Sequence, residues 1–210
     1  CRQSSILAIE QYPQLLKEIL AENSDADHPF IVVLTPGRYN SAYYEHAFLA
    51  REMDVPLVTS RDLFVDNDKV YVKTVQGRQQ VDVIYRRVDD AYLDPLCFNP
   101  DSALGVPGLM SAYLRRNVAL ANAPGTGVAD DKSIYPYVDK MIQFYLGEQP
   151  VLNNVPTYQC REQRDLDYVM ANIEQLVVKE AQGSGGYGML IGPQASKRQI
   201  DEFKAKVLSA

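Results

Sequence analysis

A continuous apolar run at residues 30–34 (FIVVL) constrains the fold of this chain more than any other stretch. A strand without polar alternation is buried on both faces, as happens in parallel sheets that helices cover on both sides. The run ends at Thr35-Pro36-Gly37, and residues 42–53 then carry a helical pattern that Asn40 or Ser41 could cap. A buried strand, a turn and a helix begin a βαβ unit, so we predict an α/β fold.

Further apolar segments extend this sheet. We predict strands at residues 56–59, 81–85 and 118–122, and a hairpin built from residues 63–65 and 69–74. One helix should run from Ser4 or Ser5 to about residue 20, with Pro13 breaking or kinking it midway, and another should end near residue 116. The resulting fold class is a Rossmann-like, mainly parallel sheet with helices.

Polar clusters follow three of the predicted strands, at residues 35–41, 86–90 and 122–132. The carboxyl ends of parallel strands meet at one edge of a sheet, where ligands bind, so these clusters could share a site. Two adjacent arginines facing two aspartates are costly on a mere connector. An ordinary strand-to-helix loop, with Asp and Asn as caps, is the alternative. The candidate residues here are Arg86, Arg87, Asp89 and Asp90.

The pattern changes after the linker-like run at residues 123–127 (APGTG), so we place a domain boundary near Val128, giving domains 1–128 and 129–210. The second domain should contain helices at about 131–146 and around residues 166–173. A strand at 176–178 and another at 189–191 follow them.

A glycine-rich stretch, VVKEAQGSGGYGM at residues 177–189, lies between those last two strands. A dinucleotide-binding turn would lead into a helix, whereas here a short apolar run closed by Gly192-Pro193 follows. A Walker A loop needs Gly-Lys-Ser/Thr, and a kinase-like loop needs its lysine after the hairpin. A hairpin that covers phosphates remains, with an exposed structural turn as the alternative. Its candidate residues are Lys179, Gly183, Ser184, Gly185, Gly186 and Gly188.

Composition excludes several other classes of function. The net charge of −6 argues against a nucleic-acid or anionic-membrane surface. Two histidines and three scattered cysteines make a metal cage or a histidine-dependent triad improbable, and we expect His46 to be packed or on the surface. Without a long apolar run or a signal peptide, we expect a cytoplasmic protein with reduced thiols.

Six stretches together resemble the ATP-grasp superfamily and, within it, the circularly permuted ATP-grasp type 2 proteins, relatives of glutathionylspermidine synthetase. The resemblance covers nearly all of the chain from about Phe30. It implies a pre-ATP-grasp α/β domain followed by part of an ATP-grasp nucleotide-binding lobe, and a ligase that joins a carboxylate to an amine through an acyl phosphate. The stretches are TPGRYNSAYYEHAFLA (35–50), VDVIYRRVDDAYLDPL (81–96), DSALGVPGL (101–109), NAPGTGVADDK (122–132), NVPTY (154–158) and the glycine-rich stretch.

The resemblance also implies roles for residues. Lys179 would contact the α- and β-phosphates of ATP, residues 183–188 would close over the β- and γ-phosphates, and Lys132 would match the first nucleotide-lobe lysine. The arginine–aspartate cluster would then line a pocket for small-molecule or peptide carboxylate and amine substrates.

Magnesium ligands in such enzymes come from a later lobe, and nothing after Gly192 offers a suitable set. We therefore expect this chain to contain no metal ligands, to need the remaining lobe of a longer protein as its partner, and to be inactive alone. The alternative is a noncatalytic nucleotide-binding or scaffold module with the same fold.

Overall fold

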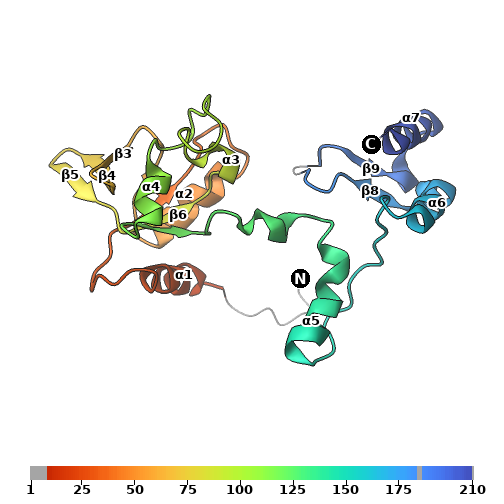
Figure 1. Ribbon diagram of the computed structural model, residues 1–210, viewed down its shortest axis with the longest axis horizontal. Coiled ribbons are helices and arrows are strands. Elements are labelled where there is room, and N and C mark those ends of the chain that lie inside the picture. The colour runs from red at the N-terminus through yellow and green to blue at the C-terminus, as the bar shows by residue number, and fades with distance from the viewer. Residues whose placement is uncertain (1–8, 184–185, 210) are drawn as a thin grey trace. The chain divides into compact units, whose positions relative to one another are not determined.

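The computed structural model describes residues 9–183 and 186–209. The chain divides into two compact units, Cys1–Gly125 and Thr126–Ala210 (Figure 1). The α/β fold class that the sequence predicts is confirmed, since the first unit contains a parallel sheet with helices. The functions that the sequence suggests for the two units stay predictions.

The central sheet of the first unit is entirely parallel. Its four strands lie in the order β2-β1-β6-β7, so β1 and β6 are central. All four residues of β1 are buried, as its uninterrupted apolar sequence predicts. The strands are β1 (Ile31–Leu34), β2 (Leu57–Val58), β6 (Val83–Arg86) and β7 (Ala119–Ala121).

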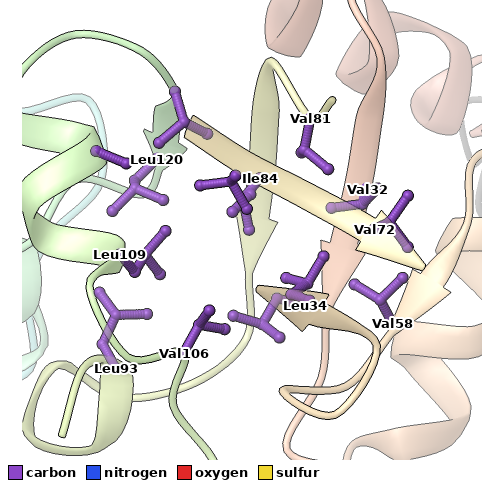
Figure 2. Close-up of a cluster of buried hydrophobic side chains, with 14 of the residues drawn as sticks. Val32, Leu34, Val58, Val72, Val81, Ile84, Leu93, Val106, Leu109 and Leu120 are labelled. Carbon is purple, nitrogen blue, oxygen red and sulfur yellow. The ribbon is translucent and has the colours of Figure 1, made fainter. Parts of the chain in front are cut away.

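Alternate residues of these strands enter two hydrophobic clusters, one on each face of the sheet. Ile31 and Val33 pack with residues of α1 (Tyr12–Ala21) and α2 (Tyr43–Glu52). Val32 and Leu34 instead join a cluster with residues of α4 (Leu109–Leu114) and of α3 (Asp90–Leu93), as Figure 2 shows. Both faces are therefore covered, which fixes the sheet and the loops at its edge.

An antiparallel sheet adds to the second of these clusters. It contains β3 (Leu63–Asp66), β4 (Lys69–Thr74) and β5 (Gly77–Gln80). The predicted hairpin is confirmed, but its third strand was not predicted, because GRQQ is polar throughout and lacks apolar alternation.

Two local predictions for helices were wrong. Pro13 lies in the first turn of α1 instead of breaking a helix midway, because a proline there gives up no intrahelical hydrogen bond. The predicted start at Ser4 or Ser5 lies outside the described residues. The N-cap of α2 is Ala42, which has no side-chain cap, whereas Asn40 accepts a hydrogen bond from the Ala42 N–H at 2.9 Å.

The second unit contains mostly short elements around a small core of Ile173, Leu190 and Ile200. The helix predicted at 131–146 is shorter, because the Tyr135–Tyr137 segment, with its central proline, forms a 3₁₀ turn before it. The elements are α5 (Val138–Leu146), α6 (Gln163–Asn172), β8 (Val177–Lys179), β9 (Met189–Ile191) and α7 (Lys197–Leu208), with 3₁₀ turns at Thr126–Asp130, Tyr135–Tyr137, Ile173–Gln175 and Gly192–Gln194.

Candidate functional site

The first candidate site lies at the carboxyl edge of the parallel sheet. Strands β1, β6 and β7 are neighbours and run in the same direction, so the loops after them leave the same edge, as predicted. The chain order reverses between β1 and β6, because β2 follows β1 on one side and β6 lies on the other. In open α/β sheets, ligands bind at such a switch point.

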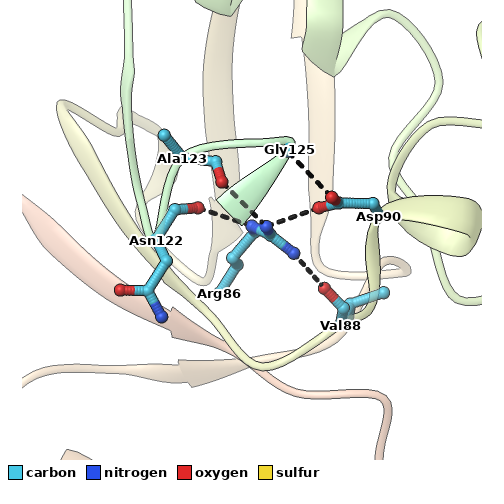
Figure 3. Close-up of polar contacts among 6 residues, drawn as sticks. All are labelled: Arg86, Val88, Asp90, Asn122, Ala123 and Gly125. Atoms are coloured by element: carbon cyan, nitrogen blue, oxygen red, sulfur yellow. Dashed lines mark hydrogen bonds and ion pairs between the residues drawn. The ribbon is translucent and has the colours of Figure 1, made fainter. Parts of the chain in front are cut away.

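Arg86, the last residue of β6, connects two of these loops (Figure 3). Its Nε donates to the Asn122 carbonyl at 2.6 Å, Nη1 to the Val88 carbonyl at 2.8 Å, and Nη2 to the Ala123 carbonyl at 3.1 Å. Only 9% of the side chain is exposed. All three nitrogens of the guanidinium are thus engaged by main-chain oxygens, which suits a residue that positions loops.

The two aspartates of the cluster differ. Asp90 pairs with Arg86 at 2.5 Å through one carboxylate oxygen and accepts the Gly125 N–H at 2.8 Å through the other (Figure 3). Asp89 is exposed and is the N-cap of α3, without a side-chain cap hydrogen bond. Asp90 therefore completes the loop network, and Asp89 faces solvent.

Arg87 contacts Glu45 and not the neighbouring aspartates that the sequence pattern suggested. Its Nη2 lies 2.6 Å from a carboxylate oxygen of Glu45 on α2, and its Nη1 donates to the Tyr85 hydroxyl at 3.1 Å. Sequence reasoning missed Glu45, although the helix after β1 was predicted to begin beside this edge. Arg87 is 27% exposed and keeps access to solvent.

A buried polar pair lies behind Arg87 and Glu45. The Thr35 hydroxyl and His46 Nδ1 are 2.9 Å apart, and both residues are almost completely buried, so the packed role expected for His46 is confirmed. Burial lowers the pKa of His46, and the nearby Arg87 charge lowers it further, against a smaller opposite effect of Glu45. Because α2 carries His46, this pair fixes α2 against the end of β1.

The second candidate site is the β8–β9 hairpin. The two strands are antiparallel, with Val178 opposite Leu190 and Lys179 opposite Met189. Val178 and Leu190 pack into the small core, so alternation places Val177, Lys179, Met189 and Ile191 on the outward face. The predicted lysine thus shares an exposed face with three apolar side chains that sequence reasoning did not single out. Alternation along both strands was the signal that could have found them.

The glycines after β8 have conformations that favour glycine. Gly186 and Gly188 have φ angles of +81° and +64°. A Cβ atom at Gly183 would lie 3.1 Å from the Tyr187 carbonyl oxygen. The candidates Ser184 and Gly185 lie outside the described residues. A glycine has no Cβ, so its main-chain N–H can come close to a ligand.

Lys132 also lies at this loop. Its main-chain N–H donates to the Ala181 carbonyl at 3.0 Å, while its ammonium contacts the carbonyls of Ala181 and Gly183. Next to it, hydrogen bonds from the Ser133 hydroxyl and N–H lower the pKa of Asp131. The structure therefore brings Lys132 to the glycine loop, whereas the ammonium of Lys179 has no hydrogen bond or ion pair among the described residues.

These residues fit part of a nucleotide. An exposed ammonium beside a glycine loop fits phosphate groups, and the apolar outward face fits a flat ring. Among residues 9–183 and 186–209, no group of three or more His, Cys, Asp or Glu side chains could hold a metal ion. Within the same ranges, no helix has both the length and the apolarity of a membrane span.

Comparison with known proteins defines the class to which this chain belongs. The family model described as "A circularly permuted ATPgrasp" matches residues 1–210, so the chain belongs to the circularly permuted ATP-grasp family, whose members generally bind ATP and Mg²⁺. The resemblance that the sequence motifs suggested is thereby confirmed.

Three relatives illustrate the range of similarity. The uncharacterized protein sll0335 of Synechocystis sp. is 53% identical over 205 residues, covering 96% of this chain and 42% of the relative. The uncharacterized protein Rv2411c of Mycobacterium tuberculosis is 49% identical, covering 96% and 37%. A Frankia alni protein named "Putative glutamate--cysteine ligase 2-3" is 44% identical, covering 97% and 24%. The chain thus spans less than half the length of each of these relatives.

Proposed function

We propose that this chain is part of an ATP-dependent ligase that joins a carboxylate to an amine through an acyl phosphate. Membership of the ATP-grasp family and the ligase name of the Frankia relative support a ligase-like function. The observation that carries the proposal is the position of Lys179, whose ammonium is exposed on the outward face of the hairpin beside the glycine loop.

In this proposal the hairpin holds ATP. Lys179 binds phosphate oxygens, and the main-chain N–H groups of the glycine loop approach the same phosphates because no Cβ intervenes. Lys132 holds the loop and lies close enough to it to share the phosphate charge. The apolar outward face, formed by Val177, Met189 and Ile191, contacts the base. Bound ATP supplies the phosphoryl group that activates the carboxylate.

The edge of the parallel sheet holds the carboxylate and amine substrates. Arg87 and Asp89 are exposed enough to meet a charged substrate. Arg86 and Asp90, which bind the loops after β6 and β7, keep that surface in place. We thus divide the predicted cluster into two residues that contact substrate and two that position them.

The test is ADP release from Mg-ATP by the longer parent protein and its Lys179→Met variant. Loss of a charge-assisted phosphate contact should raise the KM for ATP by about 10- to 100-fold. Lys197→Met, at an exposed position on α7, is the matched control and should change nothing. Equal KM values for ATP in wild type and Lys179→Met would reject the assigned role. Stabilisation by ATP without any turnover would favour a noncatalytic module.

We also propose that turnover requires the remaining lobe, which would supply the Mg²⁺ ligands. The relatives are more than twice as long as the segment that this chain matches. The parent protein should release ADP from Mg-ATP, whereas the 210-residue chain should not. ADP release by the short chain at the rate of the parent would show this to be wrong.

A further inference from the structure

Glu180 lies where the glycine loop leaves β8. Its main-chain N–H donates to the Gly188 carbonyl at 3.3 Å, which joins the two limbs of the loop. Its carboxylate lies 2.5 Å from the ammonium of Lys206 on α7. One residue therefore connects both limbs of the loop to a helix outside the hairpin.

The missing side chain of Gly188 makes room for this carboxylate. A Cβ atom at position 188 would lie 2.3 Å from Glu180 Cδ and 2.5 Å from Glu180 Oε1. Real Cβ atoms do not approach other atoms so closely. Glycine therefore suits this position for two reasons. It adopts the φ of +64°, and its missing side chain lets the Glu180 carboxylate lie against the returning limb.

The helix that carries Lys206 is well anchored. Ser196 and Gln199 form a capping box at its start, and Ile200 is buried in the small core. The ammonium of Lys206 also lies 5.8 Å from the centroid of the Phe203 ring. The hydrogen bond and the charge of Lys206 lower the pKa of Glu180, so this carboxylate is ionised at neutral pH.

Lys132 also holds the outgoing limb, through the carbonyls of Ala181 and Gly183. Two cationic side chains from different segments of the chain thus contact this limb. Lys132 binds it directly, and Lys206 binds it through Glu180. A loop held by two such contacts spends less of its time in conformations that do not bind a ligand.

We propose that Glu180 and Lys206, which we term the clasp, are positioning residues that set the glycine loop for phosphate binding. The clasp touches neither the phosphates nor the substrates and acts only through the conformation of the loop. This inference rests on the proposed function for its effect on ATP. Its effect on the loop itself does not depend on that function.

The test is a charge swap in the longer parent protein, using Glu180→Lys, Lys206→Glu and the double variant. Hydrogen–deuterium exchange of peptides covering residues 180–190 reports on the loop without nucleotide, and steady-state kinetics reports on ATP. Each single variant should raise the exchange rate of this segment and the KM for ATP by about two- to fivefold, with kcat within about twofold, because an exposed pair is weak. The double variant should restore both values.

The exposed Arg198–Glu202 pair on α7, with a distance of 2.7 Å, is the matched control, and its charge swap should change neither measurement. Unchanged exchange in both single variants, or a double variant no better than the singles, would overturn the clasp. If wild type and Lys179→Met show the same KM for ATP, the proposed function fails, and the exchange measurement still decides the clasp. Melting temperatures within about 2 °C of wild type should accompany these effects, because the pair is exposed.

Discussion

Arg86 in the first unit and Lys179 in the second were both predicted from sequence as functional cations, and the structure gives them opposite surroundings. The guanidinium of Arg86 is 9% exposed and binds three main-chain carbonyls and a carboxylate. The ammonium of Lys179 is exposed and has no partner among the described residues. A cation whose nitrogens are all engaged by the protein supports the fold, whereas one that is left free is available for a ligand.

The two residues also differ in the amount of hydrophobic core beneath them. Among the described residues, two clusters of 15 and 8 buried hydrophobic residues cover the two faces of the parallel sheet. The hairpin rests on a cluster of 3. Substitutions at the sheet edge should therefore reduce the stability of the protein, while those at the hairpin should change the loop and leave global stability nearly intact.

The largest expected effect tests the supporting role of Arg86. Lysine cannot reproduce the fork of donors that binds three carbonyls, so Arg86→Lys should reduce the free energy of unfolding by about 2–3 kcal/mol. Arg87→Lys is the matched control. Its partly exposed ion pair should cost less than about 1 kcal/mol. Equal losses of unfolding free energy in urea titrations of the two variants would show that Arg86 supports the fold no more than the partly exposed Arg87 does.

A smaller effect is expected at Gly188. Alanine there must adopt a φ of +64°, and its Cβ would displace the Glu180 carboxylate. We expect a local cost of about 1 kcal/mol, seen as faster hydrogen exchange at residues 180–190 with a global melting temperature close to that of wild type. Gly127→Ala, where a Cβ would meet nothing within 4 Å, should be silent. A global loss of stability in Gly188→Ala would show that the hairpin is more than a local element.

The smallest effect concerns pH. The folded protein lowers the pKa of His46 from its ordinary value of 6.5, so the folded state binds protons less readily than the unfolded state. His46 should therefore contribute stability that is present above pH 6.5 and lost as pH falls through its lower folded pKa. Denaturant titrations of wild type and His46→Asn between pH 7 and pH 5 measure this slope, which the variant should lack. If His28→Asn, at an exposed position, removed the slope as well, the assignment to His46 would be wrong.

Local patterns predicted the parts of the fold that burial dictates. The run at residues 30–34 could only be a strand covered on both faces, and the glycine stretch between two apolar runs could only turn back on itself. The strand Gly77–Gln80 was missed because its pairing with β4 depends on a main-chain ladder that leaves no apolar signal. A sequence pattern indicates which side chains are buried, but it does not indicate which main-chain groups form hydrogen bonds with each other.

The same limit of sequence patterns applies to the candidate sites. The edge cluster was predicted because two adjacent arginines facing two aspartates are costly on a mere connector, and Lys179 was predicted because a glycine-rich hairpin follows it. Two of the three carbonyls bound by Arg86, those of Asn122 and Ala123, lie 36 and 37 residues further along the chain, and no side chain marks them. The contact of Arg87 with Glu45 and that of Glu180 with Lys206 likewise depend on tertiary packing, which no local motif records.

The hydrogen bonds of Arg86 to main-chain carbonyls affect which positions can vary among relatives. Arg86 binds carbonyl oxygens, which every amino acid carries. The side chains at positions 88, 122 and 123 therefore take no part in these hydrogen bonds. Positions 122 and 123 can therefore vary without loss of these hydrogen bonds, whereas position 88 is also part of the buried core. One arginine can in this way hold the loops after β6 and β7 while the side chains at positions 122 and 123 differ.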